Sequence, residues 1–232
     1  MSEFDKYASD YTSMHAQNVK ASGYEPAFFD EYKIKEIHRR LQSLGIAQKE
    51  LHILNFGCGI GKSEPLLVKY FPYASIVGAD VSEDSLLLAK KANPNIKNVR
   101  WEVLSETGPI PFADTFDIIF IANVFHHIPH SEHLRIMQDL RKHLRPNGIL
   151  YMFEHNPWNP ITVKTIKDCP FDIDAVLLSP SYAGTLFKKS GFTHSTRRFT
   201  LFFPAFVGFL RPLEPLLNRL PIGAQYYYEA RL

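Results

Sequence analysis

Residues 51–62 read LHILNFGCGIGK, an apolar run followed at once by three glycines at alternate positions. Leu51–Phe56 is short and bounded by polar residues, which is typical of a buried parallel strand. The glycines can adopt positive φ and let a ligand approach backbone amides without a Cβ in the way. Asp80 stands 19 positions after Gly61, where an acid accepts hydrogen bonds from ribose hydroxyls in nucleotide-binding α/β folds. The stretch therefore predicts an adenosine-containing ligand.

Short apolar runs alternate with helical patterns along the rest of the chain. This alternation predicts right-handed crossovers and an α/β fold built on one Rossmann-like, doubly wound sheet. We expect about seven strands, mostly parallel, with an antiparallel strand at the C-terminal end. After Leu51–Phe56 the expected strands are Ser75–Ala79, Val99–Leu104, Ile118–Ala122, Ile149–Phe153, Arg197–Phe203 and Gln225–Arg231.

Four helices are expected from apolar periodicity and capping residues. Glu25–Leu44 reads as an amphipathic helix ahead of the first strand. Ser82 is expected to cap a helix that runs to about residue 92, and Ser131 a helix that is stopped by Pro146–Gly148. The fourth helix is Tyr182–Ser190, ended by the glycine that follows it.

The glycine spacing decides between ligands. A dinucleotide fingerprint needs its third glycine where this chain has Lys62, which argues against a nicotinamide oxidoreductase. The motif LNFGCGIG and the acid Asp80 resemble those of the class I S-adenosylmethionine-dependent methyltransferases. The resemblance covers about Leu51 to Phe153 well and implies S-adenosylmethionine as cofactor. The glycines would back its methionine and ribose portions, and Asp80 would hold the ribose diol.

A further stretch, SETGPIPFADTFDIIFIANVFHHI, looks like the family's segment from the third strand to the end of the fourth. Glu106 stands where the family's Asp contacts the adenine amine, and Asn123 stands beside the methionine end. The residues that the resemblance assigns to the cofactor are Gly57, Cys58, Gly59, Gly61, Asp80, Val81, Glu106 and Asn123. It implies methyl transfer to a small-molecule acceptor, mostly on an oxygen of a sugar, polyketide or lipid-linked precursor. An inert cofactor-binding module is the alternative.

Chemistry beyond the cofactor is expected after the fourth and fifth strands, at the sheet edge where open α/β folds bind ligands. His127, His155 and Glu154 are the predicted catalytic residues, since a histidine there can take a proton near neutral pH. The predicted substrate contacts are His126, Asn156 and Trp158, together with Tyr7 and Tyr11. A purely structural role in a loop is the alternative for the histidines and for Glu154, Asn156 and Trp158, and anchoring of a terminal helix is the alternative for Tyr7 and Tyr11. The crowded histidines lack a neighbouring cysteine or carboxylate trio, so no metal site is predicted.

The N-terminal stretch with Tyr7 and Tyr11 looks like the lid of small-molecule methyltransferases. We expect residues 1–48 to form this lid and a helix, and residues 49–232 to form the core. Residues 204–223 form an apolar insert in that core. Packing on the body or on a second subunit, as in a homodimer, explains such an insert most simply. The alternative is a wall for a lipid-linked or otherwise apolar acceptor, with Arg211 and Arg219 near its head group or in peripheral contact with a lipid surface.

Composition limits the remaining function classes. The 232 residues carry 26 Lys plus Arg against 24 Asp plus Glu, and no basic run predicts a nucleic-acid partner. A hydrophobic share of 45% excludes intrinsic disorder. No stretch predicts a signal peptide or a spanning helix. Cys58 and Cys169 sit in unlike contexts, which suits a reducing cytoplasm.

Overall fold

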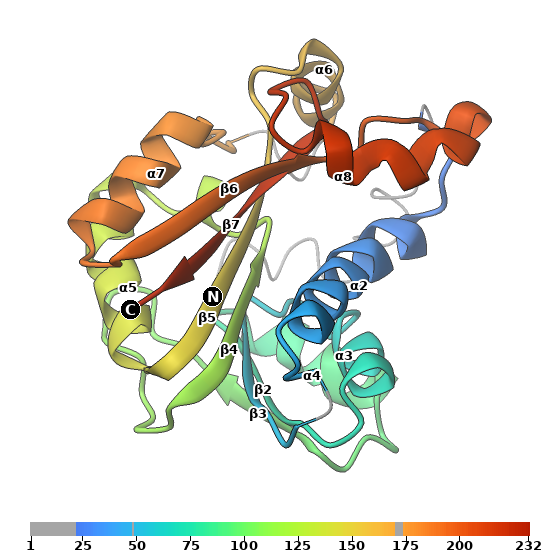
Figure 1. The fold of residues 1–232 in the computed structure, drawn as a ribbon. Helices are drawn as coiled ribbons and strands as arrows, with labels where there is room; N and C mark the ends of the chain where they lie inside the picture. The colour runs from blue at the N-terminus through green and yellow to red at the C-terminus, as the bar shows by residue number, and fades with distance from the viewer. Residues whose placement is uncertain (1–21, 48, 170–173) are drawn as a thin grey trace.

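A single sheet of seven strands organises the part of the chain that the computed structural model describes, residues 22–47, 49–169 and 174–232. The strand order is β3-β2-β1-β4-β5-β7-β6 (Figure 1). Strands β1 to β5 run parallel, β7 runs antiparallel to β5, and β6 pairs antiparallel with β7. The predicted Rossmann-like sheet with an antiparallel C-terminal strand is confirmed. Its strands are β1 His52–Phe56, β2 Ser75–Asp80, β3 Val99–Val103, β4 Phe116–Ala122, β5 Leu144–His155, β6 His194–Thr200 and β7 Gln225–Arg231.

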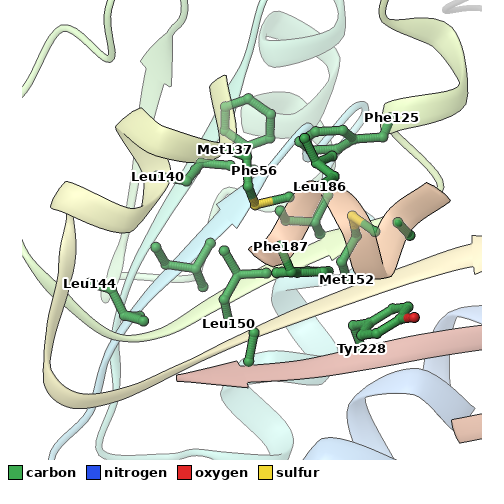
Figure 2. Packing of buried hydrophobic residues seen from close by; sticks show 14 of the residues in the cluster. Phe56, Phe125, Met137, Leu140, Leu144, Leu150, Met152, Leu186, Phe187 and Tyr228 are labelled. Carbon is green, nitrogen blue, oxygen red and sulfur yellow. The ribbon is translucent and has the colours of Figure 1, made fainter. Parts of the chain in front are cut away.

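Helices cover both faces of the sheet, with α2 and α3 on one side and α5 and α7 on the other (Figure 1). Alternate residues of the buried strands feed two cores, so that Ile53 packs with α2 and α3 whereas Leu54 packs with α5 and α7. Figure 2 shows the second core, where Met137 and Phe187 meet Leu150. The α-helices are α2 Pro26–Ser43, α3 Glu64–Tyr70, α4 Glu83–Ala92, α5 His130–Lys142, α6 Pro160–Lys167, α7 Pro180–Lys189 and α8 Glu214–Leu217, and the 3-10 helices are η3 Phe125–His127 and η5 Ala205–Leu213.

Capping residues were predicted with mixed success. Ser82 caps α4 as expected, because its Oγ accepts a hydrogen bond from Ser85 N at 3.0 Å. The prediction for Ser131 is wrong, since the N-cap of α5 is Pro129 and the helix begins two residues earlier than expected. Residues Pro146–Gly148 do not stop that helix either. They form an irregularity inside β5, where the register against β4 shifts and Asn147 takes a φ of 69°.

Strand β6 ends three residues before the predicted Phe203. Leu201 takes a left-handed φ of 60°, which breaks the extended backbone. The chain then enters η5 and α8, none of whose residues is buried, before it returns to β7. The insert predicted at 204–223 is thus the long connection between two neighbouring antiparallel strands. Among the described residues, no helix has the length and apolar content needed to cross a bilayer.

Candidate functional site

A cavity of about 1070 Å³ opens at the carboxyl ends of β1, β2 and β4. β1 lies between β2 and β4 in the sheet, so this is the switch point where doubly wound folds bind ligands. The volume slightly exceeds the usual range of small-molecule sites, about 300 to 1,000 Å³. The cavity therefore has room for a nucleoside-sized ligand and a second molecule beside it.

The glycine loop after β1 forms one wall of this cavity. Gly57 and Gly59 have φ of 73° and 54°, in the left-handed region that glycine tolerates. Hydrogen bonds from Gly57 N and Cys58 N to Ala79 O, at 2.8 and 3.1 Å, tie the loop to the end of β2. Cys58 lines the cavity, and burial raises the pKa of its thiol.

Asp80 joins the loop to the start of α4. Its Oδ2 accepts a hydrogen bond from Gly59 N at 2.7 Å, and its Oδ1 accepts one from Ser82 N at 2.9 Å. The carboxylate is 9% exposed and lines the cavity together with Val81. It therefore both shapes the loop and presents negative charge to a ligand. Glu106, on the exposed loop after β3, lines the cavity as well.

Asn123 follows β4 and has a left-handed φ of 58°. Its backbone N–H donates to Phe153 O at 2.9 Å, which fixes the residue against β5. Its side-chain Oδ1 is buried and has no hydrogen-bond partner among the described residues, although the residue lines the cavity. A buried acceptor of this kind is costly unless a ligand supplies the donor.

A buried carboxylate and three histidines meet beyond Asn123. Glu154 Oε2 lies 2.6 Å from His126 Nδ1, and its Oε1 accepts a hydrogen bond from Phe125 N at 2.9 Å. Both side chains are at most 1% exposed. The rings of His127 and His155 lie 4.1 and 5.2 Å from that of His126, centroid to centroid. The three histidines line the cavity, whereas Glu154 reaches it only through His126.

Asn156 and Trp158, predicted as substrate contacts, do not line this cavity. Asn156 is fully buried and donates from Nδ2 to Pro221 O and Gly223 O, at 3.1 and 2.8 Å. Its Oδ1 accepts from Trp158 N, so it fastens the returning insert to the end of β5. The Trp158 ring is 46% exposed and lies on the outer surface. Tyr7 and Tyr11 lie outside the described residues.

Two comparisons of sequence identify the family. Residues 53–148 match the family model described as a methyltransferase domain, a span that runs from β1 into β5 and includes the glycine loop, Asp80 and Asn123. This chain carries a class I S-adenosylmethionine-dependent methyltransferase domain. Curated proteins match the same region of the chain. The trans-aconitate 2-methyltransferase of Azoarcus sp. strain BH72 is 33% identical over 98 residues. The malonyl-[acyl-carrier protein] O-methyltransferase of Halalkalibacterium halodurans is 29% identical over 131 residues.

These matches cover 42% and 53% of this chain, and 36% and 48% of the two relatives. The chain thus aligns with less than half of either relative. Among solved structures, a S-adenosylmethionine-dependent methyltransferase from Archaeoglobus fulgidus superposes with a TM-score of 0.58. The superposition covers 86% of this chain and 94% of that one at 15% identity, so it shows a shared fold.

The buried polar atoms of this domain fit the cofactor that the family uses. The unpartnered Asn123 Oδ1 suits a donor such as the amino group of the methionine portion. Asp80 lies at the end of β2, where a ribose would meet it. Among the described residues, no group of three or more His, Cys, Asp or Glu side chains could hold a metal ion.

Sequence reasoning missed Lys33 as a residue of the site. It lies on α2, is 4% exposed and lines the same cavity. Its Nζ donates to Phe29 O at 2.9 Å, and burial lowers the pKa of its amine to about 8. A lysine on an amphipathic helix is normally expected to face solvent. The one indication in the sequence that Lys33 is buried was its position next to Ile34, an apolar residue of the buried face.

Proposed function

We propose that this chain transfers the methyl group of S-adenosylmethionine to an oxygen of a small acceptor with an apolar body. The observation that carries the proposal is that one cavity joins two sets of groups. The glycine loop, Asp80 and Asn123 line one part of it, and His126, His127 and His155 line another. A cofactor and an acceptor could therefore lie side by side.

The first set would hold the cofactor. Asp80 would accept hydrogen bonds from the ribose diol, Asn123 Oδ1 would accept one from the amino group, and Glu106 would accept one from the adenine amine. When bound, S-adenosylmethionine supplies a methyl group already activated on a positively charged sulfur. The protein then has to orient the acceptor oxygen and exclude water, more than it has to supply strong acid or base.

The second set would handle the acceptor's proton. Glu154 is a positioning residue: its carboxylate accepts from His126 Nδ1–H, which makes Nε2 the basic nitrogen of that ring. His126 would then take the proton from an acceptor hydroxyl as its oxygen attacks the methyl carbon. His127 and His155 stay predicted catalytic residues beside it. The pairing of Glu154 with His126 makes His126 the better candidate for the base.

The apolar side chains that line the cavity favour an acceptor with an apolar body. Ile161, Leu201, Phe202, Phe203 and Phe206 line it beyond the histidines. Such side chains suit the apolar part of a polyketide or lipid-linked precursor better than a free sugar. Two names support oxygen as the methylated atom. The Halalkalibacterium halodurans relative is an O-methyltransferase. The Azoarcus relative is named for trans-aconitate, a carboxylate whose oxygens can be methylated.

The test has two stages. Calorimetry should first show binding of S-adenosylmethionine and its demethylated product, and none of NAD. Transfer of a labelled methyl group should then be measured with panels of hydroxylated and carboxylated acceptors that have apolar bodies. Cofactor binding with no transfer to any panel member would leave the inert module as the better account.

Two further segments, residues 1–48 and 204–223, belong to the proposed site. We infer that residues 1–48 supply a lid over the cavity, with Tyr7 and Tyr11 as acceptor contacts. Segment 204–223 contacts a partner outside this chain, because η5 and α8 bury none of their residues.

A further inference from the structure

Exposed apolar side chains gather on α6 and on the segment between β6 and β7, and two of them also line the cavity. We call this set the rim face. Its members are Ile161 on α6, Phe206, Phe209 and Leu213 on η5, Leu216 on α8, and Leu220 and Ile222 before β7. Phe206 is 84% exposed, Leu216 80% and Phe209 76%. A protein surface that meets only water rarely gathers large apolar groups in this way.

The rim face is continuous with the cavity and is held in place by the fold. Phe206 and Ile161 line the cavity although most of each side chain faces solvent, so they stand at its opening. Asn159 Nδ2 donates to Ile222 O at 2.7 Å, which fastens the N-terminus of α6 to the end of the insert. Arg211 lies over the Phe28 ring at 4.3 Å and holds η5 against α2. Figure 1 shows α6, α8 and η5 along one side of the molecule.

The charges around the rim face are mostly positive. The two segments that carry it, 156–169 and 197–224, contain Lys164, Lys167, Arg197, Arg198, Arg211 and Arg219 against Asp168 and Glu214. Glu214 is partly buried and lies 3.5 Å from Arg211, so it contributes little negative charge at the surface. Lys164, Lys167 and Arg219 are exposed. The half-exposed Trp158 ring lies near Arg197, whose Cζ is 5.8 Å from its centroid.

Exposed apolar side chains bordered by lysine, arginine and tryptophan match the interface of a bilayer that contains anionic lipids. A second copy of the chain fits less well, because a twofold contact through this face would bring the two sets of cations together. We propose that the rim face docks on an anionic membrane surface and that the acceptor enters the cavity from that surface. Membrane docking does not depend on the proposed methyl transfer, although the entry route does.

Vesicle sedimentation tests the docking without any acceptor. The full chain should sediment with vesicles of phosphatidylcholine mixed with phosphatidylserine, and less with vesicles of phosphatidylcholine alone. Phe209→Ser combined with Leu216→Ser should lower the partition coefficient about tenfold or more, since each change removes most of an apolar side chain from the lipid contact. Lys164→Gln combined with Lys167→Gln should weaken binding to the anionic vesicles only, and added salt should do the same.

Controls separate docking from folding and from catalysis. Leu87→Ser removes a half-exposed leucine on α4, outside the rim face, and should leave vesicle binding unchanged. Each variant should keep its affinity for the demethylated cofactor, which shows that the cavity is intact. The proposal is overturned if the wild-type chain binds neither vesicle, or if the Phe209 and Leu216 variant binds as well as wild type. It is also overturned if sedimentation velocity shows a dimer that this variant dissociates.

Discussion

A Cβ placed on Gly57 would lie 2.4 Å from Val124 Cγ2, whereas a Cβ placed on Gly59 would have no atom within 4 Å. Gly57 therefore has to lack a side chain because the loops after β1 and β4 touch at this point. The packing of the protein itself leaves room for a side chain at Gly59. Both residues have left-handed φ, so an alanine at either site is strained.

This difference predicts a split between stability and binding. Gly57→Ala should lower the free energy of unfolding by more than about 2 kcal/mol, because strain and a clash add. Gly59→Ala should cost about 1 kcal/mol from strain, yet weaken binding of the demethylated cofactor at least about tenfold, because its methyl group projects into space that a ligand would use. Thermal unfolding and calorimetry measure the two effects. Equal cofactor affinity for Gly59→Ala and wild type would contradict the proposal that the cofactor contacts the glycine loop.

Asp80→Asn should weaken cofactor binding by about 1 to 3 kcal/mol, the range for losing a charged acceptor. The asparagine keeps one acceptor oxygen, so one of the two hydrogen bonds from Gly59 N and Ser82 N survives. Calorimetry with the demethylated product measures the loss. Glu83→Gln, on the exposed first turn of α4, is the matched control and should bind normally. A chain that bound NAD and no S-adenosylmethionine would refute the assignment.

His126→Gln should lower turnover of a hydroxyl acceptor by about 10²- to 10⁴-fold, the usual contribution of a general base. Glu154→Gln should show a smaller loss in the same assay, because it acts on the orientation of His126. Cofactor affinity should change little in either variant. His130→Gln is the control, since that ring stacks on Tyr182 and does not line the cavity. Parallel losses of turnover, cofactor affinity and thermal stability would mark the pair as structural.

Glu64 should make stability depend on pH. Its carboxyl is fully buried beside Asn55, and burial raises its pKa from 4.5 to about 7. Between these values the folded state holds a proton that the unfolded state has lost. The free energy of unfolding should therefore fall as pH rises from about 4.5 to 7, by up to about 3 kcal/mol. Urea unfolding at several pH values measures the slope, and Glu64→Gln should flatten it. Parallel curves for the two proteins would rule out this titration.

Asn156→Ala should destabilise the fold by about 1 to 3 kcal/mol, because it leaves the carbonyl groups of Pro221 and Gly223 without that donor. Cofactor affinity should not change, since the residue lies outside the cavity. Chemical unfolding and calorimetry give the two values. A variant with normal stability and a raised Michaelis constant for the acceptor would restore Asn156 as a substrate contact.

The meeting of the glycine loop, Asp80 and Asn123 at one cavity was predictable because the sequence signals for it are local. The glycine loop follows β1 directly, and Asp80 ends the next strand, so one strand–loop–helix pattern locates both. The position of Asn123 at the cavity was also predictable, because the carboxyl end of β4 lies at the same edge of the sheet. The parallel, doubly wound character of the sheet follows from the alternation of strands and helices.

The acceptor part was not predictable at the level of contacts. Glu154 and His126 are 28 positions apart, and their pairing depends on how β4 and β5 are aligned. Trp158 was predicted as a substrate contact because of its flat ring. The hydrogen bond from its backbone N–H to Asn156 Oδ1 instead accompanies a turn of the chain away from the cavity. The Pro146–Gly148 irregularity arises from strand register, which local turn propensity does not report.

Thr200 and Gln225 are paired neighbours on β6 and β7, so residues 201–224 leave the sheet and return to it at the same rung. A loop with both ends fixed side by side can be exchanged as a cassette without altering the strands that hold the glycine loop. The segment that borders the proposed entrance could therefore vary while the glycine loop stays unchanged. Grafting it onto another chain of this topology would also require Asn156 and Asn159, which fasten its returning end.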